Sequence, residues 1–266
     1  MQFDDEIKEI VDERIGMDNV VLLAYRGSIA HNMYIPESNP NSIDDVDIIA
    51  VHIRKAEYYL GLNTNLEKGK DIKVGKYDFA IYELKKFIYL LYKSNPNVMS
   101  LLWLNDDHYI HISAIGSRLL NERDIFMSKK VFHTFAGYAN GQLKRMTHFQ
   151  FKGYMGEKRK KLVEKYGYDT KNAAHLIRLL VMGKEALETG KFKVFRDDAD
   201  RFLQIKRGEW SLERVKEESD RLFEELHTAY TNSTLPESPD KEEIDKMLVS
   251  ILLNHILSRV VRLKTY

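Results

Sequence analysis

Short apolar runs alternate with amphipathic stretches over the first part of the chain. Isoleucine and valine recur at helical spacing near the N-terminus, and Gly16 ends that pattern, as expected for a short helix. The apolar runs that follow are rich in β-branched residues, which is typical of strands buried in a sheet. The pattern predicts a helix at residues 4–15 and strands at 19–28, 44–53 and within 68–84. A proline-containing segment at 35–42 predicts a loop.

A further helix is expected after residue 84, and Asn95-Pro96 would interrupt it. Beyond about residue 113 the pattern changes to long helical periodicities, with glycine and proline only at the joints. These predict helices at 128–150, 156–166, 169–189, 197–207, 211–231 and 240–263. We therefore expect an α+β protein, with a mixed β-sheet and flanking helices at 1–112 and an all-helical domain at 113–266.

The composition fits this picture of a compact, soluble protein. Hydrophobic residues make up 44% of the 266 residues and charged residues 30%, and there is no cysteine. The lack of cysteine excludes disulfides and thiolate metal sites and fits a reducing compartment, so we expect a cytoplasmic protein. The acidic N-terminal stretch is unlike a signal peptide, and no apolar run approaches the roughly 18 residues of a membrane span.

Two acidic residues lie inside the second predicted strand, after a Gly27-Ser28 pair that ends the first. Glycine lacks a side chain and serine adds a hydroxyl donor, so this pair would bring backbone amides close to a phosphate. Asp45 and Asp47 share one face of the strand, because side chains alternate with a period of two. Two such carboxylates repel unless a cation lies between them, and oxygen ligands favour Mg²⁺ or Mn²⁺. Asp78, in a neighbouring apolar stretch, is the candidate for the third carboxylate of a two-metal site.

The Asp-x-Asp pattern alone is weak evidence, because acidic segments are often turns or solvated loops. A charged residue inside a strand, however, is costly unless it is paired or binds a metal. Asp44 points to the opposite face, so we expect it in a turn or behind the metal ligands. Glu83 competes with Asp78 for the third position, but its place at the start of a helix favours a structural role.

A polar stripe crosses the predicted helix at 169–189, where Lys171, His175 and Arg178 follow each other at i, i+4 and i+7. Leucine and isoleucine occupy most of the remaining circumference, so the helix should be buried and the stripe needs partners. The stripe could face the metal site and bind phosphates. Alternatively, the histidine bonds to a backbone carbonyl and the arginine pairs with an acid from another helix.

The near-zero net charge of +1 conceals a basic segment at 142–193. It holds thirteen lysine and arginine residues against five acids, a net charge of +8, whereas the rest of the chain carries −7. Aromatic residues are interleaved with these cations: Phe149, Phe151, Tyr154, Tyr166 and Tyr168. Cations and aromatic rings together could contact the phosphates and stack on the bases of an RNA acceptor, such as a tRNA or a broken RNA end. A solvated helix face with its aromatic residues turned to the core is the alternative.

Several separate blocks, in this order, resemble the nucleotidyltransferases of the DNA polymerase beta superfamily. The closer likeness is to the RNA-repair-associated (RlaP-like) predicted nucleotidyltransferase group. The blocks are RGSIAHNMY, NSIDDVDIIAV, YYLGL, YDFAIYELKKF, NPNVMSLLWL, KNAAHLIRLL, IKRGEW and STLPESPD. One block contains the whole polar stripe, which favours its functional interpretation. Asn32 and Ala50 stand where this group would have glycine, a departure that concerns loop geometry more than chemistry.

The resemblance implies a polymerase-beta-like catalytic domain whose helical partner completes the nucleotide site. It implies that Gly27 and Ser28 hold the nucleotide phosphates, and we expect the polar stripe to bind phosphates beside them. Both metals would be bound by Asp45 and Asp47, while Asp78 completes the site and helps to activate the attacking hydroxyl.

We therefore expect a metal-dependent nucleotidyltransferase that moves a nucleoside monophosphate from an NTP, such as ATP, to a hydroxyl acceptor, and we expect that acceptor to be RNA. Pyrophosphate would leave. Two alternatives stay open: a non-catalytic nucleotide- or RNA-binding module of the same fold, and a toxin-like transferase acting on a protein hydroxyl. The identity of the base and the oligomeric state are also open.

Overall fold

The computed structural model describes residues 3–36, 39, 45–62, 69–147 and 157–263. Most of the loop expected at 35–42 lies outside these residues, and so does Asp44. Within the described chain, five strands form one mixed sheet. They are β1 (Val20–Tyr25), β2 (Val46–His52), β3 (Lys70–Val74), β4 (Tyr77–Glu83) and β5 (Tyr109–Ile112).

The sheet has the strand order β3-β4-β2-β1-β5. Strands β2 and β4 run parallel, and the other neighbouring pairs are antiparallel. The helices of this part are α1 (Asp4–Ile15), α2 (Gly27–Ala30), α3 (Ala56–Leu60), α4 (Leu84–Tyr92), α5 (Pro96–Met99) and α6 (Ala114–Asn121). Short 3-10 helices join them at η1 (Met17–Asn19), η2 (Ser100–Trp103), η3 (Asp106–His108) and η4 (Arg123–Phe126). The expected α+β class is confirmed.

Alternating side chains give the sheet two buried faces. On one face, Ile48 of β2 and Phe79 of β4 pack with Ile7 and Val11 of α1. On the other face, the odd-numbered positions of β2 join a larger core that includes α4 and the later helices. Asp47 is one of these odd-numbered positions of β2, so its side chain points to the face of the sheet that meets the helical part of the chain.

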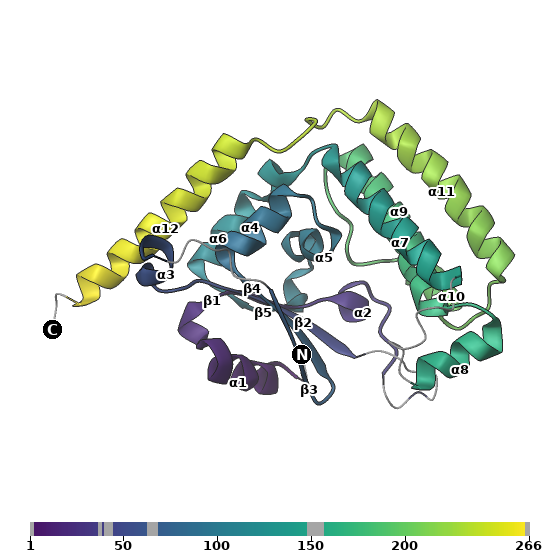
Figure 1. The fold of residues 1–266 in the computed structure, drawn as a ribbon, viewed down its shortest axis with the longest axis horizontal. Coiled ribbons are helices and arrows are strands. Elements are labelled where there is room, and N and C mark those ends of the chain that lie inside the picture. Colours follow the sequence, from purple (N-terminus) through teal and green to yellow (C-terminus); the bar gives the residue numbers. More distant parts are fainter. Residues whose placement is uncertain (1–2, 37–38, 40–44, 63–68, 148–156, 264–266) are drawn as a thin grey trace.

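The second part of the described chain is helical, as expected. Its helices are α7 (Lys130–Thr147), α8 (Glu157–Tyr166), α9 (Thr170–Thr189), α10 (Ala199–Lys206), α11 (Leu212–Asn232) and α12 (Lys241–Leu263). Helix α9 lies at the centre, between α7, α10 and α11 (Figure 1). The sequence pattern located all six and missed β5 and α6, which complete the sheet side of the fold. The expected division between residues 112 and 113 stays a prediction.

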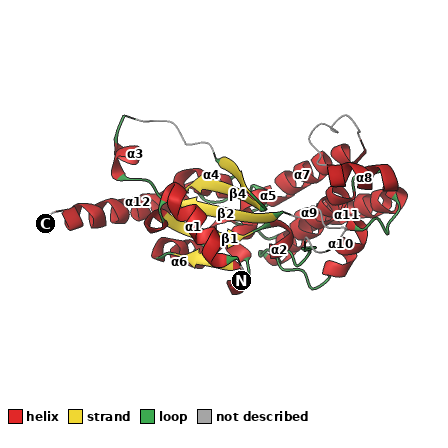
Figure 2. Cartoon of the chain, turned by 90° about the horizontal axis from the view of Figure 1, so that it is seen from below, coloured by secondary structure: helices red, strands yellow, loops and turns green. Residues whose placement is uncertain are grey.

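Helix α12 returns from the helical part to the sheet and extends past it toward the C-terminus (Figure 2). It packs on α4, and Arg118 of α6 donates a hydrogen bond to Ser250 over 3.0 Å. Asp240 caps its first turn by accepting from the amides of Glu242 and Glu243.

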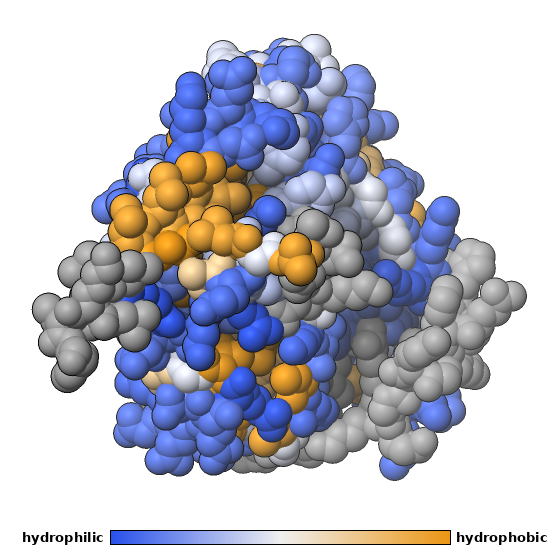
Figure 3. Space-filling view, turned by 60° about the vertical axis from the view of Figure 1, so that its left-hand side comes forward, coloured by the Kyte–Doolittle hydropathy of each residue, from blue (hydrophilic) through white to orange (hydrophobic). Residues whose placement is uncertain are grey.

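Large apolar residues gather on the outer surface that Figure 3 brings forward. Among the described residues, the exposed large hydrophobic side chains are Leu60, Leu62, Tyr89, Ile112, Val249, Leu253 and Leu257. None of the helices in the described ranges has the length and apolarity needed to cross a membrane.

Glu83 is a structural residue, as its position at the start of a helix indicated. It is buried and forms the N-cap of α4, where its carboxylate accepts from the amides of Lys85 at 2.9 Å and Lys86 at 3.1 Å. The hydroxyl of Tyr59 also donates to it over 2.6 Å. Its oxygens are therefore occupied by the fold.

We expect Glu83→Ala to lower the free energy of unfolding by about 1–3 kcal/mol, because the cap is lost and the part-buried hydroxyl of Tyr59 loses its acceptor. Urea denaturation measures this change. The matched control is Glu57→Ala, at an exposed position, which should stay within about 0.5 kcal/mol of the original protein. Equal effects of the two variants would contradict the capping role.

Candidate functional site

The turn after β1 lies directly beneath the carboxylate of Asp47. Gly27 has a φ of +60°, and a Cβ at this position would overlap the side-chain oxygen of Asp47. The amide of Arg26 donates to the backbone carbonyl of Asp47 over 2.9 Å, which fixes the turn against β2. Glycine is therefore required here both by the backbone conformation and by the close approach of the carboxylate. Beside it, the hydroxyl of Ser28 is buried and has no hydrogen-bond partner among the described residues.

Two of the three predicted carboxylates lie on neighbouring strands, and the third, Asp45, lies just before one of them. Asp47 and Asp78 are register partners on the parallel strands β2 and β4, so their side chains leave the same face. Asp45 precedes β2 and forms an exposed ion pair with Lys73 of β3, at 3.0 Å. Among the residues that the structure describes, no three acidic or histidine side chains are close enough together to hold a metal ion.

Burial raises the pKa of the Asp47 carboxyl above its usual range. Arg26 and Lys171 oppose this shift by stabilising the charged form, whereas the nearby charges of Asp78 and Asp45 add to it. The ionised carboxylate is thus less favourable in the folded protein than in water. A cation bound at this position would remove that disadvantage.

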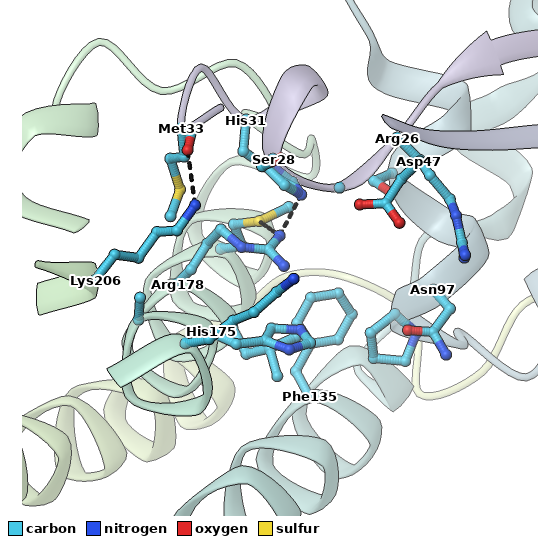
Figure 4. Close-up of a pocket in the computed structure, with 17 residues that line it drawn as sticks. Arg26, Ser28, His31, Met33, Asp47, Asn97, Phe135, His175, Arg178 and Lys206 are labelled. Atoms are coloured by element: carbon cyan, nitrogen blue, oxygen red, sulfur yellow. Dashed lines mark hydrogen bonds between the residues drawn. The ribbon is translucent and has the colours of Figure 1, made fainter. Parts of the chain in front are cut away.

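Helix α9 faces the turn across a cavity of about 260 Å³ (Figure 4). The turn, with Gly27, Ser28 and Asp47, forms one side of it, and the stripe of Lys171, His175 and Arg178 forms the other. Figure 4 shows Asp47 and Arg26 opposite Arg178 and His175. The described lining includes six cationic or histidine side chains: Arg26, His31, Lys171, His175, Arg178 and Lys206. Asp47 supplies the one carboxylate of that lining, and neither Asp45 nor Asp78 takes part. We call this space the phosphate cavity, after the ligand that the sequence analysis expected these residues to bind.

A buried histidine holds Arg178 in place. The Nδ1 of His31 lies 2.9 Å from the carbonyl oxygen of Val194, and Arg178 hydrogen-bonds to its Nε2. Burial and the charge of Arg178 lower the pKa of His31 well below its usual range, so the ring is neutral. A neutral ring that donates from Nδ1 accepts the arginine proton at Nε2. Burial also lowers the pKa of Arg178, to about 10, which leaves it charged at neutral pH.

Three consecutive residues tie the turn to the helical part. His31 donates to the carbonyl of Val194, and the side-chain Nδ2 of Asn32 donates to the carbonyl of Arg196 over 3.2 Å. Lys206 donates to the carbonyl of Met33 over 2.9 Å. Asn32 has a φ of +58°, which explains why glycine was expected there: asparagine is among the few other residues that tolerate this conformation. Asn32 therefore keeps the backbone conformation that a glycine would have at this position.

Sequence reasoning missed Arg26, His31 and Lys206 as site residues. Each lies inside a block that carried the family resemblance, two of them in RGSIAHNMY and the third in IKRGEW. Lys206 is only 5% exposed, and a lysine so deeply buried in a cavity wall needs acceptors. The sequence could not show that Lys206 is buried, and without that burial nothing marked it as a site residue.

The basic segment at 142–193 is divided between several roles. Tyr168 is buried, with its hydroxyl donating to the carbonyl of Trp210 over 2.7 Å, and Tyr166 packs against Gly208. These two aromatic residues serve the core, as the alternative interpretation expected. Lys184 pairs with Glu225 at 3.0 Å. The other three aromatic residues that the sequence analysis named and one cation lie outside the described residues: Phe149, Phe151, Tyr154 and Lys152.

We expect the stability of the protein to fall in mild acid partly through His31. Its pKa is lower in the folded than in the unfolded state, so its contribution is present above about pH 6.5 and lost as the pH falls below it. The loss is about 1.4 kcal/mol per pH unit while only the unfolded state takes up the proton. Urea denaturation at pH 7.5 and 5.5 should show a smaller decrease for His31→Gln. A decrease equal to that of the original protein would contradict a neutral His31.

The chain is similar to known proteins over different shares of its length. An uncharacterized protein of Methanocaldococcus jannaschii is 28% identical over 155 residues, which make up 56% of this chain and 55% of that protein. The chain thus spans about half the length of this curated relative. A solved nucleotidyltransferase-like protein from Exiguobacterium sibiricum is 9% identical, with a TM-score of 0.32, over 86% of this chain and 74% of that one. This likeness is too distant to bear on the site.

The stronger match is a profile that covers residues 4–250, and therefore the sheet, the turn and the helices that frame the cavity. It confirms the resemblance expected from the sequence blocks. The chain belongs to the RNA repair pathway DNA polymerase beta family.

Proposed function

We propose that the protein transfers a nucleoside monophosphate from an NTP to a hydroxyl group of RNA and releases pyrophosphate. The observation that carries this proposal is the position of Asp47, directly over the Gly27-Ser28 turn and across one cavity from Lys171 and Arg178. Cations together with an unpartnered hydroxyl fit the oxygens of a polyphosphate. A buried carboxylate between them fits a cation that accompanies the polyphosphate.

The side chains divide the work of such a transfer. Ser28 donates its hydroxyl to a phosphate oxygen, while Lys171 and Arg178 offset the charge of the triphosphate. The acceptor oxygen bonds to the α-phosphorus as the bond from that phosphorus to the bridging β-oxygen breaks, so pyrophosphate departs. Asp78, the register partner of Asp47, takes the proton of the attacking hydroxyl. The protein acts mainly by positioning these groups.

The donor set agrees in chemistry with Mg²⁺ or Mn²⁺, because it consists of carboxylate oxygens on one face of the sheet. When bound, such an ion would offset phosphate charge and favour the departure of pyrophosphate. Asp47 and Asp78 would hold it. Asp45 would join them by exchanging its exposed ion pair with Lys73 for the metal.

RNA is the acceptor that the charge distribution favours, because the +8 segment includes the helix that faces Asp47. RNA affinity should then fall as salt rises. A protein hydroxyl would have less need of this charge. A non-catalytic binding module is disfavoured by Asp47, since a binding site for phosphates has no use for a carboxylate whose ionised form is penalised by burial.

Labelling tests the proposal and its alternatives together. The protein is incubated with each of the four α-labelled NTPs, Mg²⁺ or Mn²⁺, total cellular RNA and total cellular protein. Label in the RNA pool is expected. Label in the protein pool would instead favour a protein acceptor, and no transfer with any NTP would favour the binding module.

A further inference from the structure

A second cavity, of about 620 Å³, adjoins the phosphate cavity. We call it the α7 cavity because most of its described lining comes from that helix. The two spaces share a wall made of Asn97, Lys171 and His175. The other lining residues are Gly137, Tyr138, Gly141, Gln142, Arg145 and Asn172. A ligand bound in the phosphate cavity can therefore extend along α9 into the α7 cavity.

Two glycines keep the wall of the α7 cavity open. Gly137 and Gly141 lie one turn apart in the interior of α7. Glycine at such positions makes a helix less stable than alanine would. A Cβ at either position would meet no atom within 4 Å. Gly183 of α9 differs, since a Cβ there would press on Phe135 at 3.1 Å. Close packing therefore explains why residue 183 is a glycine, but it explains neither glycine of α7. We infer that the two glycines of α7 make space for a ligand.

Next to Gly141, the side chain of Gln142 is 4% exposed, and its Oε1 has no hydrogen-bond partner within the described ranges. A buried acceptor without a donor destabilises a fold, so such an atom requires an explanation. An N–H group of a ligand in the cavity that Gln142 lines would supply the donor. This observation is independent of the two glycines and points to the same space.

The size of the two cavities indicates which part of a nucleotide each holds. The phosphate cavity, at about 260 Å³, is smaller than the roughly 300–1,000 Å³ typical of ligand pockets, so a whole NTP needs further space. The α7 cavity offers amide side chains and no carboxylate in its described lining. Its chemistry suits the edge of a nucleobase.

Resting on the proposed function, we propose that the α7 cavity holds the adenine of ATP and that Gln142 reads its exocyclic amino group. Glutamine pairs with adenine through two hydrogen bonds, one from the N6 amino group to Oε1 and one from Nε2 to N7. The unpartnered Oε1 of Gln142 is the acceptor that this pairing requires. Gly137 and Gly141 give the base its space.

Calorimetric titration with three probes tests this assignment: inorganic tripolyphosphate, ATP, and purine riboside triphosphate, which lacks the N6 amino group, each with Mg²⁺. Gly141→Leu fills the cavity from a position where the fold has room. We expect it to weaken ATP binding more than about tenfold while tripolyphosphate binding is unchanged. Gly141→Ala adds a single methyl group to the same space and should weaken ATP binding by less than Gly141→Leu does.

Gln142→Leu tests the reading of the amino group. The original protein should prefer ATP to purine riboside triphosphate by about tenfold, and the variant should bind the two equally. A preference that survives in Gln142→Leu, or normal ATP affinity in Gly141→Leu, would overturn the assignment. Loss of RNA binding with normal ATP affinity in Gly141→Leu would also overturn it, because the cavity would then hold the acceptor.

The tripolyphosphate probe separates this inference from the function on which it rests. If tripolyphosphate and ATP bind the original protein and only the variants behave unexpectedly, the α7 assignment fails and the phosphate cavity stands. If neither probe binds the original protein, the proposed function fails, and the adenine site fails with it.

Discussion

Asp47→Asn is expected to lower the rate of pyrophosphate release by about 10³-fold or more and to make the protein more resistant to urea. The loss of activity follows from removing a charged group at the reacting centre. The gain in stability follows from the raised pKa: burial penalises the ionised carboxylate, so at neutral pH the folded state holds a charge that the unfolded state solvates better. Asparagine removes that charge, and we expect a gain of about 0.5–2 kcal/mol.

The sign can be checked against pH. A folded-state pKa above the unfolded value means that the contribution of Asp47 is fully present below the unfolded pKa and is lost as the pH rises through the folded pKa. The advantage of Asp47→Asn should therefore be larger at pH 7 than at pH 4. Asp71→Asn, at an exposed position on β3, is the matched control and should change neither activity nor stability. An active Asp47→Asn protein would contradict the site.

Gly27→Ala should reduce activity by about 10²-fold or more. The methyl group would overlap the carboxylate of Asp47, and a shift of about 1 Å at a reacting group is enough for such a loss. The positive φ adds about 1–2 kcal/mol of destabilisation for alanine, measurable by urea denaturation. Pyrophosphate release measures the activity.

Gly75→Ala separates the two causes. Gly75 lies in the turn between β3 and β4 with a φ of +57°, but a Cβ there would meet no atom within 4 Å. Alanine at this position should cost a similar amount of stability and leave activity unchanged. If Gly75→Ala lowered activity as much as Gly27→Ala, backbone strain and not the approach to Asp47 would explain the loss.

The helical half of the fold could be predicted well because long amphipathic periods persist over many residues. The sequence pattern ended the predicted helix at residue 189, where α9 ends, and placed the first helix at 4–15, as observed. Strand β5 was missed because it has four residues and packs at the edge of the sheet. So short a run carries too little periodicity to be distinguished from a loop.

The site was predictable where spacing along one element decides geometry. Lys171, His175 and Arg178 share a face of α9 because of helical spacing, and the structure places all three in the phosphate cavity. Contacts between residues far apart in the sequence produce no pattern of spacing, so they could not be predicted. The hydrogen bond from Arg178 to His31 joins residues 147 positions apart, and the ion pair of Lys73 with Asp45 depends on the neighbouring hairpin.

The most direct test follows α-labelled ATP and RNA through the reaction and compares label with pyrophosphate. The account predicts that the protein releases one pyrophosphate for each labelled nucleotide joined to RNA, and that Asp47→Asn loses both products together. Pyrophosphate or label transfer that persists in Asp47→Asn, or RNA that stays unlabelled with every NTP, would contradict it.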